Sequence, residues 1–183
     1  MISEKETIRI SKYLSLVLRH KPESIGIQLD ENGWTAVDAL IQNLRKGGIR
    51  INHDMLQFIV DNNNKKRFAY SEDHLKIRAS QGHSIDVELG YSATTPPDLL
   101  YHGTPDKNVD FILQDGLVKK NRHHVHLSKD IETAINVGKR HGKPVVFKIS
   151  SGLMQKENFE FFVSENGVWL TNNVPAKYLQ ILK

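Results

Sequence analysis

A fixed cation and a titratable imidazole lie side by side near the start of the chain. The stretch SLVLRHKPE (residues 15–23) places Arg19 and His20 at the end of an apolar helical pattern, just before Pro22. Cations near the last carbonyl groups of a helix compensate its dipole, which stabilises the helix by about 0.3–1 kcal/mol. Dipole compensation explains a cation at this place but does not require an imidazole beside it. We therefore treat the pair as a candidate for chemistry.

The densest histidine group is NRHHVHLS, residues 121–128. On a strand, His124 and His126 would point the same way, whereas Arg122 and His123 would lie on opposite faces. An H-x-H pair on a strand can ligate a metal ion. No His-x-x-x-His or His-Glu pairing is nearby to complete such a site. A buried, hydrogen-bonded structural histidine at position 126 is the alternative interpretation.

The tetrapeptide YHGT (residues 101–104) is a second candidate. Glycine between a histidine and a hydroxyl residue at a strand end lets the backbone approach a ligand closely. A simple exit from the strand into a turn would look the same. The sequence contains neither G-x-G-x-x-G nor G-x-x-x-x-G-K-[ST], so its motifs exclude a Rossmann or P-loop nucleotide site.

Composition narrows the class of protein. The 183 residues are 39% hydrophobic and 25% charged, which is typical of a soluble globular protein. The absence of cysteine excludes disulfides, thiolate catalysis and Cys-ligated zinc. No apolar run approaches the roughly 20 residues that cross a bilayer, and MISEKETIR lacks the apolar core of a signal peptide. We expect a cytoplasmic protein without a membrane segment. Because the net charge is only +4, a polyanion site must come from locally clustered cations.

Residues 1–80 are predicted to form three helices followed by a hairpin. Ser3 and Glu6 fit a capping box, IGIQLDENGW reads as a short strand and turn, Thr35 opens the second helix, and Asn52 caps the third. The helical stripes that these signals bound are Ile10, Tyr13, Leu14, Val17 and Leu18; then Val37, Leu40, Ile41 and Leu44, ended by Gly47-Gly48; then Met55, Leu56, Ile59 and Val60.

The hairpin is predicted in KKRFAYSEDHLKIRAS, with a polar turn at residues 71–73. Phe68 and Tyr70 share one face, as do Leu75 and Ile77. The opposite face, with Arg67, Lys76 and Arg78, is expected to show cations to solvent or to a phosphate backbone. Three helices and a hairpin indicate a winged-helix-like lobe.

Residues 81–97 lose helical periodicity and end in Pro-Pro, which indicates an inter-lobe connection. Residues 98–183 are predicted to form a β-rich α+β lobe. The expected strands are LLYHGT, HVHLS and PVVFKIS, the expected helices are KNVDFILQDG and DIETAINVGKRHG, and FEFFVSENGVWLT is expected to form a hairpin around Glu165-Asn166-Gly167.

Eight segments together resemble the tRNA 2′-phosphotransferases, in register from about residue 9 to 179. They are SKYLSLVLRHKPE, DENGW, KKRFAY, IRASQGHS, LYHGT, RHHVHLS, VGKRHG and VWLTNNVP. The resemblance implies a winged-helix RNA-binding lobe followed by an ADP-ribosyltransferase-like lobe that binds NAD without a Rossmann motif. It implies RNA with an internal 2′-phosphate, tRNA-like in kind, and NAD as co-substrate. It requires neither a metal nor a protein partner.

The reaction that the resemblance implies has two steps. The RNA 2′-phosphate displaces nicotinamide from NAD, and the ribose 2″-hydroxyl then attacks that phosphate. The products are 2′-hydroxyl RNA and ADP-ribose 1″,2″-cyclic phosphate, as in tRNA splicing and processing. The family's catalytic arginines and histidine map onto Arg19, His20, Arg67 and Arg122.

The resemblance also implies a further set of binding residues. For NAD these are His102, Gly103, Thr104, Ser128, Asp130 and Arg140. Apart from the resemblance, Arg45, Lys46 and Arg50 are candidate contacts to the RNA backbone, although a solvated helix surface also explains them. Lys76 and Arg78 are further candidates on the basic face of the predicted hairpin.

Two other functions stay open on the sequence. One is ADP-ribosylation of a terminal phosphate on RNA or DNA, which stops after the first step and uses the same residues. The other is a noncatalytic winged-helix RNA-binding protein, which predicts loss of one or more of the arginines. None of them is lost.

Overall fold

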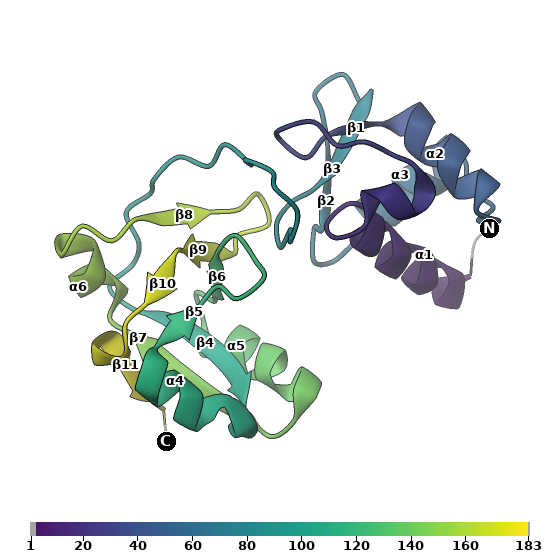
Figure 1. Ribbon diagram of the computed structural model, residues 1–183. Coiled ribbons are helices and arrows are strands. Elements are labelled where there is room, and N and C mark those ends of the chain that lie inside the picture. The colour runs from purple at the N-terminus through teal and green to yellow at the C-terminus, as the bar shows by residue number, and fades with distance from the viewer. Residues whose placement is uncertain (1–2, 183) are drawn as a thin grey trace. The chain divides into compact units, whose positions relative to one another are not determined.

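The computed structural model describes residues 3–182. The chain divides into two compact units, one ending at Gly90 and one beginning at Tyr91 (Figure 1). The division falls inside residues 81–97, and His83 and Val87 on its N-terminal side are buried in the first unit. Each unit mixes helices with small antiparallel sheets, which confirms the α+β class.

Three helices and a three-stranded sheet make up the first unit. Its strands run in the order β1-β3-β2, and apolar faces of all three helices meet in one core. The elements are α1 (Glu4–Val17), the 3₁₀ turn η1 (Pro22–Ile25), β1 (Thr35–Ala36), α2 (Val37–Lys46), α3 (His53–Asp61), β2 (Phe68–Tyr70) and β3 (Lys76–Ala79).

The predicted helix caps are present. The Ser3 hydroxyl accepts a hydrogen bond from the Glu6 amide at 3.3 Å, and the Asn52 side chain accepts one from the Met55 amide at 2.8 Å. These bonds satisfy amides that have no partner inside the first turn of a helix, so α1 and α3 begin where the polar residues predict.

Two expectations between α1 and α2 were wrong. The first half of IGIQLDENGW is no strand, because the Ile27 amide instead donates to the Pro22 carbonyl at 3.2 Å and closes the η1 turn. The turn that follows is confirmed by a 2.8 Å bond from the Asp30 amide to the Trp34 carbonyl. Thr35 does not open the helix, because it pairs with Ile77 in β1 and α2 begins two residues later.

The hairpin β2–β3 forms with the predicted apolar face, but one of the three cations on its predicted basic face, Arg78, is buried. Phe68 and Ile77 are buried, whereas Leu75 precedes β3 and is 66% exposed. Arg78 is only 8% exposed, since its guanidinium carbon lies 4.4 Å from the ring centroid of Trp34. The expectation that Arg78 faces solvent or a phosphate backbone was therefore wrong.

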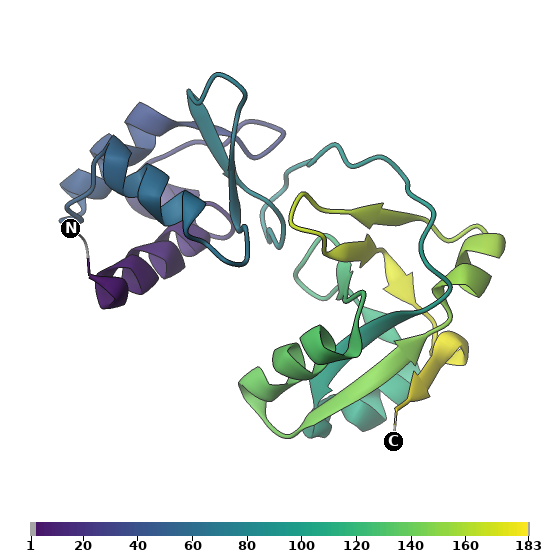
Figure 2. The same cartoon turned by 180° about the vertical axis from the view of Figure 1, so that it is seen from behind.

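In the second unit, α5 packs on one face of the β4–β7 pair, as Figure 2 shows from behind. The sheets have the orders β11-β7-β4, β6-β9-β8 and β10-β5. The elements are β4 (Leu100–Pro105), η2 (Asp106–Asn108), α4 (Val109–Asp115), β5 (Leu117–Val118), β6 (Val125–Leu127), α5 (Ile131–Gly138), η3 (Lys139–His141), β7 (Pro144–Ile149), α6 (Ser151–Lys156), β8 (Phe161–Val163), β9 (Trp169–Thr171), β10 (Asn173–Val174), η4 (Ala176–Tyr178) and β11 (Leu179–Ile181).

All strands and helices predicted for residues 98–183 are present, although several are shorter than expected. The β8–β9 hairpin turns at Gly167, whose φ of 77° favours glycine. The sequence did not predict β5, β10, β11 or α6. Within residues 3–182, no helix has the length and apolarity needed to cross a bilayer.

Candidate active site

Two of the predicted catalytic arginines meet at the end of α1. The Arg19 guanidinium Nη2 donates to the Arg67 carbonyl at 3.4 Å, across 48 residues of sequence. His20 follows Arg19 and is exposed. Its amide donates to the Leu16 carbonyl at 2.9 Å, so the helical path continues past the end of α1 to the imidazole.

The backbone of Arg67 is held by two hydrogen bonds. Its amide donates to the Asn63 side-chain oxygen at 3.4 Å, and its carbonyl accepts from the Ser80 amide at 2.9 Å. Asn63 is itself buried and donates to the Ser11 hydroxyl of α1 at 3.0 Å. This network ties the segment before β2 to α1 and fixes the backbone of Arg67, whose side chain is half-exposed, against Arg19.

Ser84 completes this cluster, and sequence reasoning missed it. The Ser84 hydroxyl lies 2.8 Å from the Nδ1 of His20, and the Ser84 amide donates to the Arg19 carbonyl at 3.0 Å. Ser84 belongs to the QGHS segment already noted in the sequence, but nothing in that segment indicates which side chain the hydroxyl meets.

Arg122, the fourth predicted catalytic residue, belongs to a histidine cluster in the second unit. Its Nη1 donates to the Nδ1 of His126 at 3.1 Å, and the Nδ1 of His102 donates to the His126 carbonyl at 3.0 Å. Burial lowers the pKa of His102, and the Arg122 charge lowers it further, although the bond to His126 opposes both. His102 is therefore neutral near pH 7, with Nε2 as a hydrogen-bond acceptor.

Burial also lowers the pKa of His124, with smaller contributions from His123 and Lys119. The ring of His124 packs near Phe162, with centroids 5.4 Å apart. His126 is hydrogen-bonded, as its alternative interpretation expected, but it is only half-buried rather than buried. In the described part of the chain, no three His, Asp or Glu side chains gather as metal ligands would.

Gly103 was expected to let a ligand approach the backbone, but the group that lies against it is helix α5. A Cβ at Gly103 would collide with the Ala134 carbonyl of α5 and lie 3.0 Å from the Gly138 amide. The neighbouring Thr104 is 3% exposed, and its hydroxyl accepts from the Asn108 amide group at 3.2 Å. Gly103 is thus explained by strand–helix packing without reference to a ligand.

The remaining residues predicted for NAD surround the same strand. Ser128 exchanges two backbone hydrogen bonds with Tyr101, of 2.7 and 2.9 Å. Asp130 caps α5 by accepting from the Thr133 amide at 2.7 Å and from its hydroxyl at 2.9 Å. Arg140 is exposed in η3.

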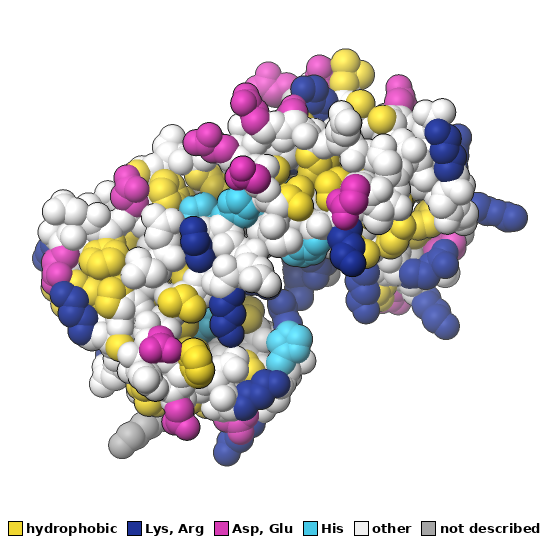
Figure 3. All heavy atoms as spheres, viewed as in Figure 1, with side chains coloured by type: hydrophobic (Ala, Val, Ile, Leu, Met, Phe, Trp, Pro, Cys, Tyr) yellow, Lys and Arg dark blue, Asp and Glu magenta, His cyan; other side chains and the backbone are white. Residues whose placement is uncertain are grey.

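Cations predicted for RNA are spread over the first unit. Arg45, Lys46 and Arg50 are exposed around the α2–α3 connection, and Lys76 is paired with Asp30 at 3.2 Å. Figure 3 shows Lys and Arg side chains gathered along the side of this unit that carries α1 and α2.

Comparison with known proteins identifies the family of this chain. Residues 5–173 match the model of the family described as RNA 2′-phosphotransferase, Tpt1 / KptA family. The chain belongs to this family, and the resemblance noted in the sequence is confirmed.

Curated relatives are similar in sequence to this chain over nearly their full length. A probable RNA 2′-phosphotransferase of Flavobacterium johnsoniae is 56% identical over 171 residues, which cover 93% of this chain and 94% of that protein. Proteins with the same description from Nostoc punctiforme and Fusobacterium nucleatum are 50% and 48% identical, over 98% and 94% of this chain and 99% and 97% of theirs.

Proposed function

We propose that this protein removes an internal 2′-phosphate from RNA by transferring it to NAD. Family membership supports the phosphate transfer. The observation that carries the proposal is the cluster of Arg19, His20, Arg67 and Ser84, because the Arg19 guanidinium bonds to the backbone of Arg67 and the neighbouring imidazole of His20 has a defined partner in Ser84. Arg122 is proposed as the third arginine.

The arginines suit the first step. A 2′-phosphate is already ionised at neutral pH, so it needs no base to act as a nucleophile. One of its oxygens bonds to the anomeric carbon of the nicotinamide ribose, the carbon–nitrogen bond breaks, and nicotinamide leaves with the electron pair. Guanidinium groups hold such a phosphate through charge-assisted, bidentate hydrogen bonds.

The second step needs proton transfer. The ribose 2″-hydroxyl oxygen bonds to phosphorus, and the bond from phosphorus to the RNA 2′-oxygen breaks. The hydroxyl must lose a proton and the departing 2′-oxygen must gain one. An imidazole titrates in the right range to do both, and we assign this role to His20.

We propose that the first unit is a winged-helix-like RNA-binding lobe and that the second is an ADP-ribosyltransferase-like NAD-binding lobe. The neutral His102 supports this assignment, because its Nε2 can accept a hydrogen bond from a ribose hydroxyl. The other proposed NAD contacts are Gly103, Thr104, Ser128, Asp130 and Arg140. The proposed RNA contacts are Arg45, Lys46, Arg50 and Lys76; the buried Arg78 is withdrawn.

The decisive experiment incubates a 2′-phosphorylated oligoribonucleotide with and without NAD and measures the mass of both products. We expect 2′-hydroxyl RNA and ADP-ribose 1″,2″-cyclic phosphate only with NAD, at one NAD per phosphate removed. EDTA should leave the rate unchanged, because the proposed steps use no metal. Phosphate released without NAD would overturn the proposal. ADP-ribose retained on a terminal phosphate would favour the alternative ADP-ribosylation activity.

A further inference from the structure

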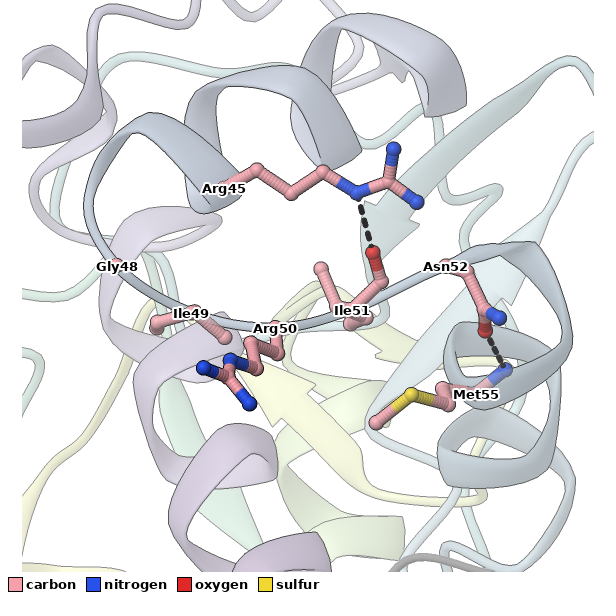
Figure 4. A pocket seen from close by; sticks show the side chains of 7 residues that line it. All are labelled: Arg45, Gly48, Ile49, Arg50, Ile51, Asn52 and Met55. Atoms are coloured by element: carbon pink, nitrogen blue, oxygen red, sulfur yellow. Dashed lines mark hydrogen bonds between the residues drawn. The ribbon is translucent and has the colours of Figure 1, made fainter.

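Two depressions adjoin on the surface of the first unit. The larger, of about 580 Å³, lies at the α2–α3 connection (Figure 4). It is lined by Arg45, Arg50 and Asn52 and by the apolar Ile49, Ile51 and Met55. The smaller, of about 370 Å³, is lined on α1 by Arg9, Lys12, Tyr13 and Leu16, and again by Ile49. Because Ile49 lines both, we treat them as one surface and name it the α1 groove.

The groove combines positive charge with apolar surface. The lining residues of the two depressions include four cations and no carboxylate. Arg45 is preordered, because its Nε donates to the Ile51 carbonyl at 2.6 Å, and Figure 4 shows its terminal nitrogens beyond that bond. Arg9 pairs with Glu6 at 3.7 Å on the exposed surface of α1. Such a surface complements a nucleic acid strand, in which charged phosphates alternate with sugars and the bases present apolar faces.

One side of the groove leads to the proposed catalytic histidine. Arg9, Tyr13, Leu16 and His20 follow one another at intervals of four, three and four residues, so they share a face of the same helical path. The bond from the His20 amide to the Leu16 carbonyl continues that path to the imidazole. At about 1.5 Å per residue, Arg9 lies roughly 16 Å along the axis from His20. Leu16, between them, is 38% exposed.

We propose that the α1 groove binds the nucleotides that flank the 2′-phosphate in a single-stranded RNA substrate. Arg9, Lys12, Arg45 and Arg50 would contact backbone phosphates, while Tyr13, Leu16 and Ile49 would contact sugars and bases. This inference rests on the proposed function, because it assumes that His20 acts on the 2′-phosphate. It makes RNA length a determinant of affinity, since a substrate with few flanking nucleotides leaves the groove empty.

The test compares two substrates that share one 2′-phosphate: a trinucleotide with that phosphate at its centre, and a long single-stranded RNA with the same three nucleotides in its middle. The variant is Lys12→Glu combined with Arg50→Glu, which reverses charge on both depressions. The matched control is Lys156→Glu, which reverses an exposed cation at the end of α6 in the second unit. KM, kcat and the salt dependence of KM are measured for each pair.

We expect the variant to raise KM for the long RNA at least tenfold more than KM for the trinucleotide. The slope of log KM against log salt should also fall by about 0.7 for each backbone phosphate that the variant no longer neutralises. The control should match the wild type on both substrates. Equal changes in KM on the two substrates, or no change on either, would overturn the inference.

Failure of the proposed function gives a different result, in which the wild type leaves both 2′-phosphates in place. A direct binding measurement then tests whether the α1 groove binds RNA. Fluorescence anisotropy with the labelled long RNA should show at least tenfold weaker binding for the charge-reversal variant than for the wild type and the control. Equal binding by all three proteins would overturn the inference.

Discussion

The Nδ1 of His20 and the hydroxyl of Ser84 lie 2.8 Å apart, although 64 residues separate them in the sequence. A hydroxyl both donates and accepts hydrogen bonds, so Ser84 can remain the partner of the imidazole in either tautomer. The Ser84 amide also donates to the Arg19 carbonyl at 3.0 Å, which fixes the serine against the turn that carries His20. Because Ser84 engages Nδ1, the proton transfer that we propose for His20 would use Nε2.

Ser84→Ala tests that positioning role. Loss of a hydrogen bond worth about 0.5–1.5 kcal/mol should slow phosphate removal up to roughly tenfold, whereas nicotinamide release in the first step should change little. Ser84→Thr keeps the hydroxyl and should retain most of the activity. Single-turnover kinetics of both products provide the measurement. A Ser84→Ala enzyme that removes phosphate at the wild-type rate would show that the contact is incidental.

Arg67→Ala and Arg122→Ala should each lower kcat/KM roughly ten- to a hundredfold, which corresponds to about 1.5–3 kcal/mol for a lost charge-assisted hydrogen bond. The fold should survive, because the backbone of Arg67 makes its ordering bonds and Arg122 is exposed. Lysine at either position keeps the charge but loses the planar guanidinium group, so the activity of each lysine variant should lie between those of the wild type and the alanine variant. Melting far below the wild type would reassign the arginine to a structural role.

Arg78→Ala should destabilise the first unit, because it removes a buried cation stacked on Trp34 and bonded at 3.5 Å to the carbonyls of Asn32 and Leu89. We expect a loss of about 2 kcal/mol or more in the free energy of unfolding. Lys76→Ala on the same strand removes an exposed ion pair and should cost at most about 1 kcal/mol. Urea unfolding in a Trp169→Phe background, with Trp34 as the fluorescent reporter, measures both. Equal losses would contradict this account of Arg78.

His102 should make the stability of the second unit depend on pH. Its folded-state pKa is lowered, chiefly by burial, from an ordinary value of 6.5. The unfolded chain therefore takes up a proton before the folded chain does, so stability is full above about pH 6.5 and falls as the pH drops toward the folded pKa. His102→Asn should flatten the thermal stability profile between about pH 7.5 and pH 5.5. The exposed control His141→Asn should keep the wild-type slope, and equal slopes in all three proteins would refute this role.

Elements with strong local signals could be predicted from the sequence. Ser3 and Asn52 cap their helices because a short polar side chain satisfies free amides without help from the rest of the fold. The two-residue strands β1, β5 and β10 carry no alternation of their own and exist only because each finds a partner strand. Thr35 is the clearest case, since its helical pattern was real but pairing with Ile77 places it in β1.

In the candidate site, too, contacts with segments distant in the sequence could not be predicted. Alternation correctly places Arg78 opposite the apolar face of its hairpin, but Trp34 from a distant turn covers it. Gly103 was expected to let the backbone approach a ligand, and the structure instead shows the backbone of α5 against it. Residue types singled out the Arg19–His20 pair and the resemblance added Arg67, whereas the contact of Ser84 with His20 depends on how the segment after β3 folds back on α1.

Single-turnover reaction of His20→Ala with a 2′-phosphorylated oligoribonucleotide and NAD tests the proposed mechanism most directly. Because the first step uses an ionised nucleophile, nicotinamide should be released at nearly the wild-type rate. Removal of the phosphate should slow by on the order of 10²–10⁴-fold, the contribution of a positioned acid–base group. RNA carrying 2′-phospho-ADP-ribose should then accumulate and be visible by mass. If nicotinamide release and phosphate removal instead slow in parallel and no ADP-ribosylated RNA is formed, the assignment of His20 to the second step is contradicted.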